Sequence, residues 1–376
     1  MPLSTVVLGI ENTFNNCCVA LINEAKKILF ERNIVFRPDT KIKQDTTEWS
    51  IRLFEFHKET LPSLLKAAEK FIDENTITVD FLSLATLPHF NSHVAFARSC
   101  AETFGKGQLP IVEVDHVNAH LLSGFLSSQP LAFPFISLTI AGVHSNLSIA
   151  WKPNHYQLLG SHQQSPKNKL GHGRAIGSVL DKCAELIGLV SDGHPDGAIQ
   201  IDKVSKKYDG PFLSFDELYA ANHHNAFNFD FHQAYELVNN LLLAQKNHPF
   251  KMDNISGLTQ NYPGKAYRRR QYTNSTARRY NTARAVLCKS YIFQIAASLQ
   301  QASMNILLEK AFKAAKKYGV PRIAFGGGVA ANSRLRELAS MRAPQENVAI
   351  FFPAPEYCAD NAVMIGLSGL INKEII

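Results

Sequence analysis

Two histidines, His116 and His120, have a spacing suited to metal binding in the segment Asp115-His-Val-Asn-Ala-His120. Residues four apart on a helix share a face, and imidazoles placed in this way are typical ligands of zinc or iron. The spacing taken alone favours the plainer alternative, two structural histidines. Val117 also excludes the H-E-x-x-H pattern of metalloproteases, which requires glutamate at that position.

A third, anionic ligand would have to come from a distant part of the chain. Asp360 is the candidate, in the segment Cys358-Ala-Asp-Asn361. It follows an expected strand and precedes an expected helix. Its alternative role is an ordinary helix N-cap, a position that aspartate favours.

A run of glycines follows a short apolar segment in Phe325-Gly-Gly-Gly-Val-Ala-Ala-Asn332. Glycine lets backbone N–H groups approach a phosphate closely, and the start of a helix favours anions. The pattern predicts a strand over Arg322–Phe325, a glycine loop, and a helix over Ala330–Ala339. Asn332 then lies at the helix start, and we favour nucleotide binding over a simple tight turn.

Two further candidates are an isolated acid and a basic cluster. Asp181 lies in an expected helix, Val179–Leu189, where it could accept ribose hydroxyls or form a surface ion pair. Between Tyr267 and Tyr280 basic and aromatic residues interleave, which suits phosphate contacts and base stacking in RNA, although most such runs are merely solvated. The candidate RNA-contacting side chains are Arg268, Arg269, Arg270, Arg278 and Arg279.

The elements that must position these residues form two similar sets. Apolar runs at Val6–Ile10 and Cys17–Ile22 flank a polar turn, and Phe135–Ile140 and Leu147–Trp151 repeat the pattern. The repeat predicts a duplicated α/β architecture, with a first lobe over 1–131 and a second over 132–376. We expect an irregular insertion around 152–284 and a helix from His116 to Phe125.

Composition narrows the class of protein. Over 376 residues, 45% are hydrophobic and 19% charged, as in soluble globular proteins of two domains or lobes. No apolar run is long enough for a transmembrane helix, and Thr5–Ile10 reads as a core strand rather than a secretory signal. The six cysteines form no C-x-x-C pair, which favours a reducing compartment. A net charge of +7 favours an anionic partner only weakly, because a basic mitochondrial matrix enzyme shows the same balance.

Together these segments resemble the TsaD-like family of tRNA threonylcarbamoyladenosine synthases over nearly the whole chain. The most specific matches are Asp115–His120, Ile295–Arg336 and Pro353–Ile365, with a shorter one at Ile255–Leu258. Phe133–Phe135 and Leu180–Cys183 are similar to the mitochondrial-type branch. The long match over Ile295–Arg336 argues against a carbamoyltransferase that acts on a small molecule.

The resemblance implies two actin/Hsp70-like lobes with a nucleotide cleft between them. It also implies transfer of a threonylcarbamoyl group from threonylcarbamoyl-adenylate to N6 of the tRNA adenosine 3′ of the anticodon. A divalent metal ion, iron or zinc, would be held by His116, His120 and Asp360. A mitochondrial matrix location, with the cytoplasm as the alternative, and a homodimer follow by resemblance only. The implied substrate-binding residues are Ile140, Ala141, Gly142, Val143, His144, Asp181, Gly197, Gly327, Gly328 and Asn332.

Several motifs of the family are altered in this chain. The first loop carries Asn15 and Asn16 where the family has acids, and Ser178 replaces the last acid of another motif. The segment 87–93 has lost its glycines. Two interpretations remain: a divergent, active transferase, which we favour because the metal ligands persist, and a catalytically degenerate paralogue that serves as a scaffold or binding partner in tRNA modification.

Overall fold

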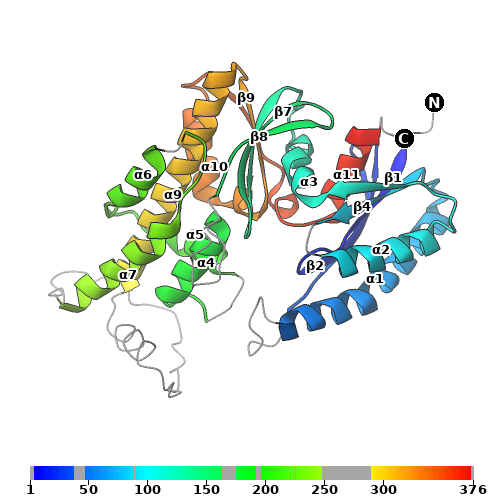
Figure 1. Ribbon diagram of the computed structural model, residues 1–376, viewed down its shortest axis with the longest axis horizontal. Coiled ribbons are helices and arrows are strands. Elements are labelled where there is room, and N and C mark those ends of the chain that lie inside the picture. The colour runs from blue at the N-terminus through cyan, green and yellow to red at the C-terminus, as the bar shows by residue number, and fades with distance from the viewer. Residues whose placement is uncertain are drawn as a thin grey trace.

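The computed structural model describes residues 4–37, 47–87, 90–162, 175–191, 196–224, 226–247 and 289–373. These residues form two five-stranded sheets; in Figure 1 the first lies to the right and the second near the centre. The first sheet has the order β3-β2-β1-β4-β5 and the second the order β10-β9-β6-β7-β8. The first comprises β1 (Val6–Glu11), β2 (Asn16–Asn23), β3 (Ile28–Val35), β4 (Phe81–Thr86) and β5 (Ile111–Asp115). The second comprises β6 (Phe135–Ile140), β7 (Ser145–Lys152), β8 (His155–Ser161), β9 (Arg322–Gly326) and β10 (Ala349–Phe351).

The two sheets have the same topology. In each, the first strand pairs antiparallel with the second and parallel with the fourth. The third strand adds antiparallel to the second, and the fifth adds parallel to the fourth. The expected duplicated α/β architecture is confirmed. Both expected hairpins are present, and each forms the first two strands of its sheet.

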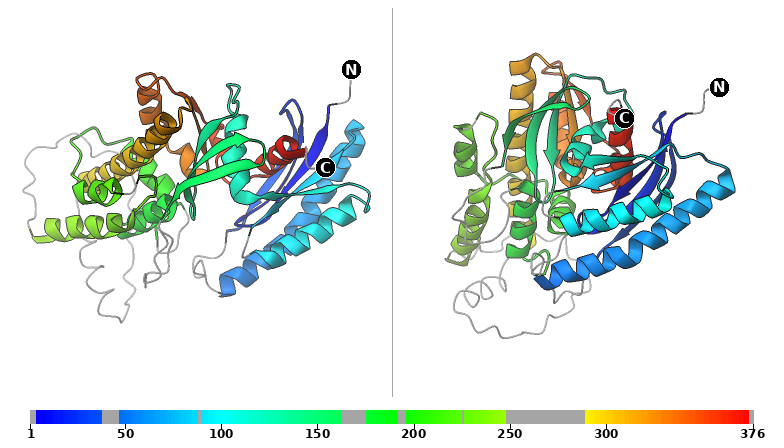
Figure 2. Two further views of the ribbon diagram at one scale, coloured as in Figure 1. Left: turned by 45° about the horizontal axis from the view of Figure 1, so that its top comes forward. Right: turned by 45° about the vertical axis from the view of Figure 1, so that its right-hand side comes forward.

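Helices cover both faces of the first sheet. α1 (Thr47–Asn75) and α2 (Asn91–Phe104) lie on one face, and α11 (Ala362–Asn372) lies on the other (Figures 1 and 2). Successive residues of a strand point to opposite faces, so Leu8 packs with α1 and α2 while Val7 packs with α11. Burial on both faces explains why β1 is apolar without alternation.

The C-terminal helix therefore contacts the first sheet, although the expected division at residue 131 placed it with the second lobe. Gly9 of β1 allows this contact to be very close. A Cβ atom added to Gly9 would lie 2.1 Å from the carbonyl oxygen of Ala362 at the start of α11. Local sequence patterns cannot show which sheet such an apolar helix will cover.

The second sheet carries the remaining helices. They include the long buried α9 (Lys289–Tyr318) and, after a 3-10 turn η2 (Gly328–Ala331), α10 (Ser333–Arg342). The expected helix over 330–339 thus begins three residues late, because the glycine loop continues into that turn. The described parts of 152–284 are more regular than expected and contain β8, α4 (Ile176–Leu186), α5 (Gly197–Ser205), α6 (Asp216–His223) and α7 (His232–Asn247). Their short lengths and many polar residues obscure helical periodicity.

A short helix, α3 (His116–Leu122), lies between the two sheets and continues as the 3-10 turn η1 (Ser123–Leu126). α3 contacts β5 and α11 on one side and β6 and β9 on the other. It therefore occupies the junction of the two halves. Among the described helices none is long and apolar enough to cross a membrane.

Candidate metal centre and its phosphate loops

α3 begins directly after β5 and presents both expected histidines on one face. Asp115 caps the helix, because its side chain accepts a hydrogen bond of 2.8 Å from the backbone N–H of Asn118. His116 and His120 are both buried, and their ring centroids lie 4.8 Å apart. The expected helix and the expected common face are confirmed.

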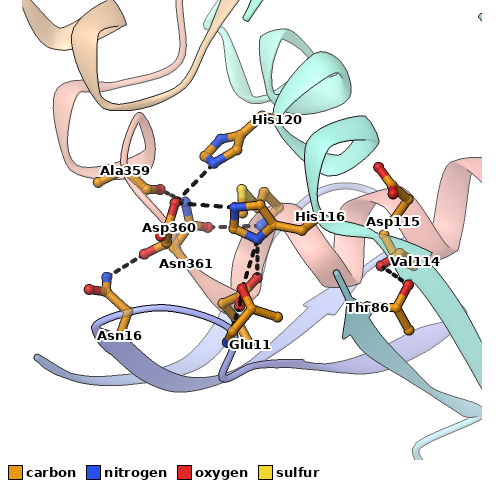
Figure 3. A network of polar contacts seen from close by, with 12 residues as sticks. Glu11, Asn16, Thr86, Val114, Asp115, His116, His120, Ala359, Asp360 and Asn361 are labelled. Atoms are coloured by element: carbon orange, nitrogen blue, oxygen red, sulfur yellow. Dashed lines mark hydrogen bonds and ion pairs between the residues drawn. The ribbon is translucent and has the colours of Figure 1, made fainter. Parts of the chain in front are cut away.

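Asp360 meets these histidines from the other end of the chain (Figure 3). Its Oδ1 lies 2.9 Å from Nε2 of His120 and 3.5 Å from Nε2 of His116. Asn361, rather than Asp360, caps α11 by accepting from the N–H of Met364. The alternative N-cap role of Asp360 is therefore wrong, and its carboxylate is available to the histidines.

Glu11, at the end of β1, belongs to the same site, and the analysis of sequence alone did not assign it. Its Oε2 accepts a hydrogen bond of 2.8 Å from Nδ1 of His116. Thr13 donates to the other oxygen through its backbone N–H and its hydroxyl, at 2.8 Å and 2.6 Å. A proton held on Nδ1 leaves the lone pair of Nε2 directed at the site. The glutamate that opens the first loop was the signal that could have revealed it.

The charges of this site fit a bound cation. Burial by itself would lower the pKa of His116, but the carboxylates of Glu11 and Asp360 raise it well above its usual range. Burial would likewise raise the pKa of Asp360, but the two histidines lower it. The fully buried carboxylate of Glu11 and the partly buried carboxylate of Asp360, beside two imidazoles, favour positive charge, which a proton or a metal ion can supply. The nearest nitrogen and oxygen atoms of His116, His120 and Asp360 all lie within 4.8 Å of one another, which suits one ion.

The glycine loop lies directly against α3, the helix that carries both histidines. A Cβ atom on Gly326 would lie 2.0 Å from the carbonyl oxygen of His120, and one on Gly327 would lie 2.3 Å from that of Ile140. Gly327 also has a φ of 84°, which disfavours other residues. The structure therefore brings together the expected glycine loop, the end of β6 and the triad of His116, His120 and Asp360.

Asn332 has a structural role at this loop. Its Oδ1 caps α10 by accepting from the N–H of Leu335 at 3.1 Å, and it also accepts from Gln300 at 2.8 Å. Only its Nδ2 end could therefore donate to a ligand. The position of Asn332 at the helix start is as expected, although its contact with a nucleotide stays a prediction.

The loop after β6 faces the same region. Gly142 accepts from the backbone N–H of Ser178 at 3.0 Å and also from its hydroxyl. Ser178, where the family has an acid, thus fixes this loop to α4. Burial, with smaller contributions from neighbouring histidines that include His116 and His120, lowers the pKa of His144 to about 4. His144 is accordingly neutral near pH 7 and does not repel a cation at the triad.

Asp181 of α4 and Gly197 at the start of α5 lie next to each other. Asp181 accepts from the N–H of Ala198 at 2.7 Å, and a Cβ on Gly197 would lie 2.6 Å from the Cα of Asp181. Burial raises the pKa of Asp181 to about 7. The neighbouring Lys182 forms its ion pair with Glu185 rather than with Asp181. The five candidate arginines at 268–270 and 278–279, and the Ile255–Leu258 match, lie outside the described residues.

Known proteins resemble this chain over most of its length. The model of the TsaD family, tRNA N6-adenosine threonylcarbamoyltransferase, matches residues 57–367. A relative from Thermotoga neapolitana described by the same words is 29% identical, and the match covers 96% of this chain and 93% of the relative. Another, from Anaeromyxobacter sp. (strain Fw109-5), is 33% identical over 70% of this chain and 63% of the relative.

Solved structures match at the level of fold. Full-length HypF in a phosphate- and nucleotide-bound form has a TM-score of 0.56 and 12% identity, covering 99% of this chain and 56% of that chain. HypF of T. kodakarensis has a TM-score of 0.53 and 13% identity, covering 99% of this chain and 48% of that chain. At such identities the likeness shows the fold alone, and it confirms the expected two-lobe, actin/Hsp70-like architecture.

Proposed function

We propose that this chain, which belongs to the tRNA N6-adenosine threonylcarbamoyltransferase family, transfers a threonylcarbamoyl group from threonylcarbamoyl-adenylate to N6 of a tRNA adenosine 3′ of the anticodon. The observation that carries the proposal is the junction between the two sheets. There, the buried His116 and His120 and the partly buried Asp360 adjoin the glycine loop and the loop after β6.

The triad would hold one divalent ion through Nε2 of each histidine and the carboxylate of Asp360. Two nitrogens and one oxygen suit zinc or iron(II), and three protein ligands leave room for a substrate. An ion in this position supplies Lewis-acid stabilisation of negative charge that develops on the donor. Glu11 keeps His116 in the tautomer that can bind the ion.

The glycine loop would hold the adenylate. Gly327 and Gly328 precede α10 and carry no side chain that would keep a phosphate from their backbone N–H groups. N–H donors in this position stabilise the charge of a leaving phosphate. Asp181, beside the start of α5, would accept from the ribose hydroxyls.

The reaction exchanges one bond at the carbamoyl carbon for another and removes one proton from N6. N6 of adenosine bonds to the carbamoyl carbon, the bond from that carbon to the phosphate oxygen breaks, AMP leaves, and N6 loses a proton. The exocyclic amine of adenine is a weak nucleophile, so the main task of the protein is to align the two substrates. The unpartnered, buried Nε2 of neutral His144 could accept that proton, because no described residue occupies it.

A reconstituted transfer reaction tests the proposal. Purified protein with measured metal content would be incubated with threonylcarbamoyl-adenylate and unmodified tRNA, and the nucleosides would be analysed by mass spectrometry. We expect threonylcarbamoyladenosine from the wild type and from His155→Ala, whose side chain is exposed, and none from His120→Ala. An absence of product from metal-loaded wild type that still binds tRNA would contradict the proposal and favour a scaffold.

Three further parts of the proposal rest on resemblance or composition. The basic cluster at 268–279 would dock the tRNA. A mitochondrial matrix location and a homodimer would follow from the mitochondrial-type motifs. Cell fractionation and the mass of the purified protein in solution would test the last two.

A further inference from the structure

The segment that carries Asp360 is held by side chains from both halves of the molecule. On the side of the second sheet, Arg336 of α10 donates to the carbonyl oxygen of Pro353 at 2.7 Å and contacts Sγ of Cys358 at 3.2 Å. Within the segment, Asn361 donates to the carbonyl oxygens of Tyr357 and Ala359 at 3.2 Å and 2.7 Å.

The carbonyl oxygen of Asp360 itself has a different partner. Nδ2 of Asn16, the first residue of β2, donates to it at 2.6 Å, across 344 residues of sequence (Figure 3). Asn16 thereby ties the third ligand residue to the first loop. The same loop carries Glu11 and Thr13, which orient His116.

The chemistry of this contact depends on the amide. A carbonyl oxygen can only accept a hydrogen bond, and an aspartate at position 16 would present a second acceptor at the same place. We propose that Asn16 is a positioning residue that holds Asp360 in register with His116 and His120 for metal binding. The amide found where the family has an acid is then a working part of this site. This inference rests on the proposed metal site.

Substitution of Asn16 by Asp distinguishes two effects on cation binding: the hydrogen bond that positions Asp360 and the net charge near the triad. An added carboxylate near the triad would strengthen cation binding if charge alone mattered. If Asn16 acts through its hydrogen bond, Asn16→Asp replaces an attraction with a repulsion between oxygens and weakens binding. Asn16→Ala removes the hydrogen bond and adds no charge. Asn23→Asp, at the far end of β2, is the matched control. It makes the same change of amide to carboxylate, and Oδ1 at this position can still accept a hydrogen bond from the backbone N–H of Lys27.

The measurement is the affinity for Zn²⁺, by competition with a chromophoric chelator, together with the absorption spectrum of the Co²⁺-loaded protein. We expect binding about threefold to tenfold weaker in Asn16→Ala. We expect at least the same loss in Asn16→Asp, with altered Co²⁺ bands in both and wild-type behaviour in Asn23→Asp. Thermal unfolding with chelator present would establish that each variant is folded.

The outcomes distinguish this inference from the proposed function. Wild-type protein that binds no Zn²⁺ or Co²⁺ would overturn the metal site and the inference with it. Wild-type protein that binds the ion, with either Asn16 variant binding as tightly or more tightly, would overturn the inference alone. If Asn16→Asp does not fold, Asn16→Ala and its Co²⁺ spectrum still decide the question.

Discussion

Glu11 and Thr13 determine what His116 can do. The carboxylate of Glu11 accepts from Nδ1 at 2.8 Å, so only Nε2 is available to an ion. Glu11 is fully buried, and in the described structure its partners are His116 and two groups of Thr13. A carboxylate buried so completely is costly unless positive charge lies beside it, which links its presence to the function of the site.

Glu11→Gln should weaken metal binding while leaving the fold intact. Glutamine fills the same space, but its neutral oxygen makes His116 less basic and can place its amide towards the ring. Loss of the carboxylate that hydrogen-bonds the other ring nitrogen of a metal-binding histidine typically lowers metal affinity about 10- to 100-fold. Chelator competition would measure it. Glu24→Gln, which alters an exposed ion pair with Lys373, should bind metal as the wild type does.

Asp181 should make stability depend on pH. Its pKa is raised from 3.8 to about 7 in the folded protein. Between these values the unfolded chain releases the proton and the folded chain keeps it, so stability falls as pH rises from about 4 to 7 and then stays level. Asp181→Asn can still accept from Ala198, and it should be more stable than wild type at pH 8 by about 1–3 kcal/mol.

Urea unfolding at pH 4.5 and pH 8 would measure this difference. We expect the advantage of Asp181→Asn to be small at the lower pH and large at the higher one. An equal difference at both would show that the carboxyl group is not perturbed in this way. If Asp181 also meets the ribose, the more stable variant should have a higher KM for the adenylate.

At the scale of elements, the site depends on how closely β1, α3 and α11 approach one another. Glycine permits the close approach of β1 to α11, through Gly9, and a further one of β9 to the end of α3, through Gly326. Asp360 and Asn361 directly precede α11, so the position of that helix sets the position of Asp360, the third candidate ligand. Small residues at these contacts therefore affect the site without touching a ligand.

Gly9→Ala should move α11 and with it Asp360. The added methyl would meet backbone atoms of Ala362 and Gly366, which cannot rotate away. Overpacking of this kind costs about 1–3 kcal/mol of stability, and it should also lower metal affinity. Denaturant unfolding and Zn²⁺ titration would measure both. Asn33→Ala, on the exposed edge strand β3, should change neither, and a loss of stability without any loss of metal affinity would contradict the link.

At the scale of the molecule, the triad joins distant parts of one chain. His116 and His120 follow the last strand of the first sheet, whereas Asp360 follows the last strand of the second. An ion bound by all three would stabilise the native arrangement of both halves, because the unfolded chain cannot hold these residues together.

Metal should therefore raise the melting temperature and chelator should lower it. Free ion at about 100 times its dissociation constant contributes about 2.7 kcal/mol to stability. Calorimetry with Zn²⁺ or with chelator would measure the shift. His120→Ala should show no shift, whereas His155→Ala should shift as the wild type does. Equal shifts in both variants would place the bound ion elsewhere.

Several features of the fold and of the candidate site were predictable because they depend on local sequence patterns. The spacing of His116 and His120, the strand before the glycine loop, and the repeated strand–turn–strand pattern all depend on neighbouring residues. The sequence by itself therefore predicted the duplicated fold and offered His116 and His120 as candidate ligands. For Asp360 it left an N-cap as an alternative, because a helix start looks the same in either role.

Only the tertiary structure decided how these parts meet. Three contacts join residues far apart in the chain. They are the hydrogen bond between His116 and Glu11, the hydrogen bond from Asn16 to Asp360, and the packing of α11 on the first sheet. Such contacts depend on how two sheets pack around α3, and no local periodicity encodes that packing. For the same reason Asn16, which reads in sequence as a lost acid, is in the structure a hydrogen-bond donor to the residue that completes the triad.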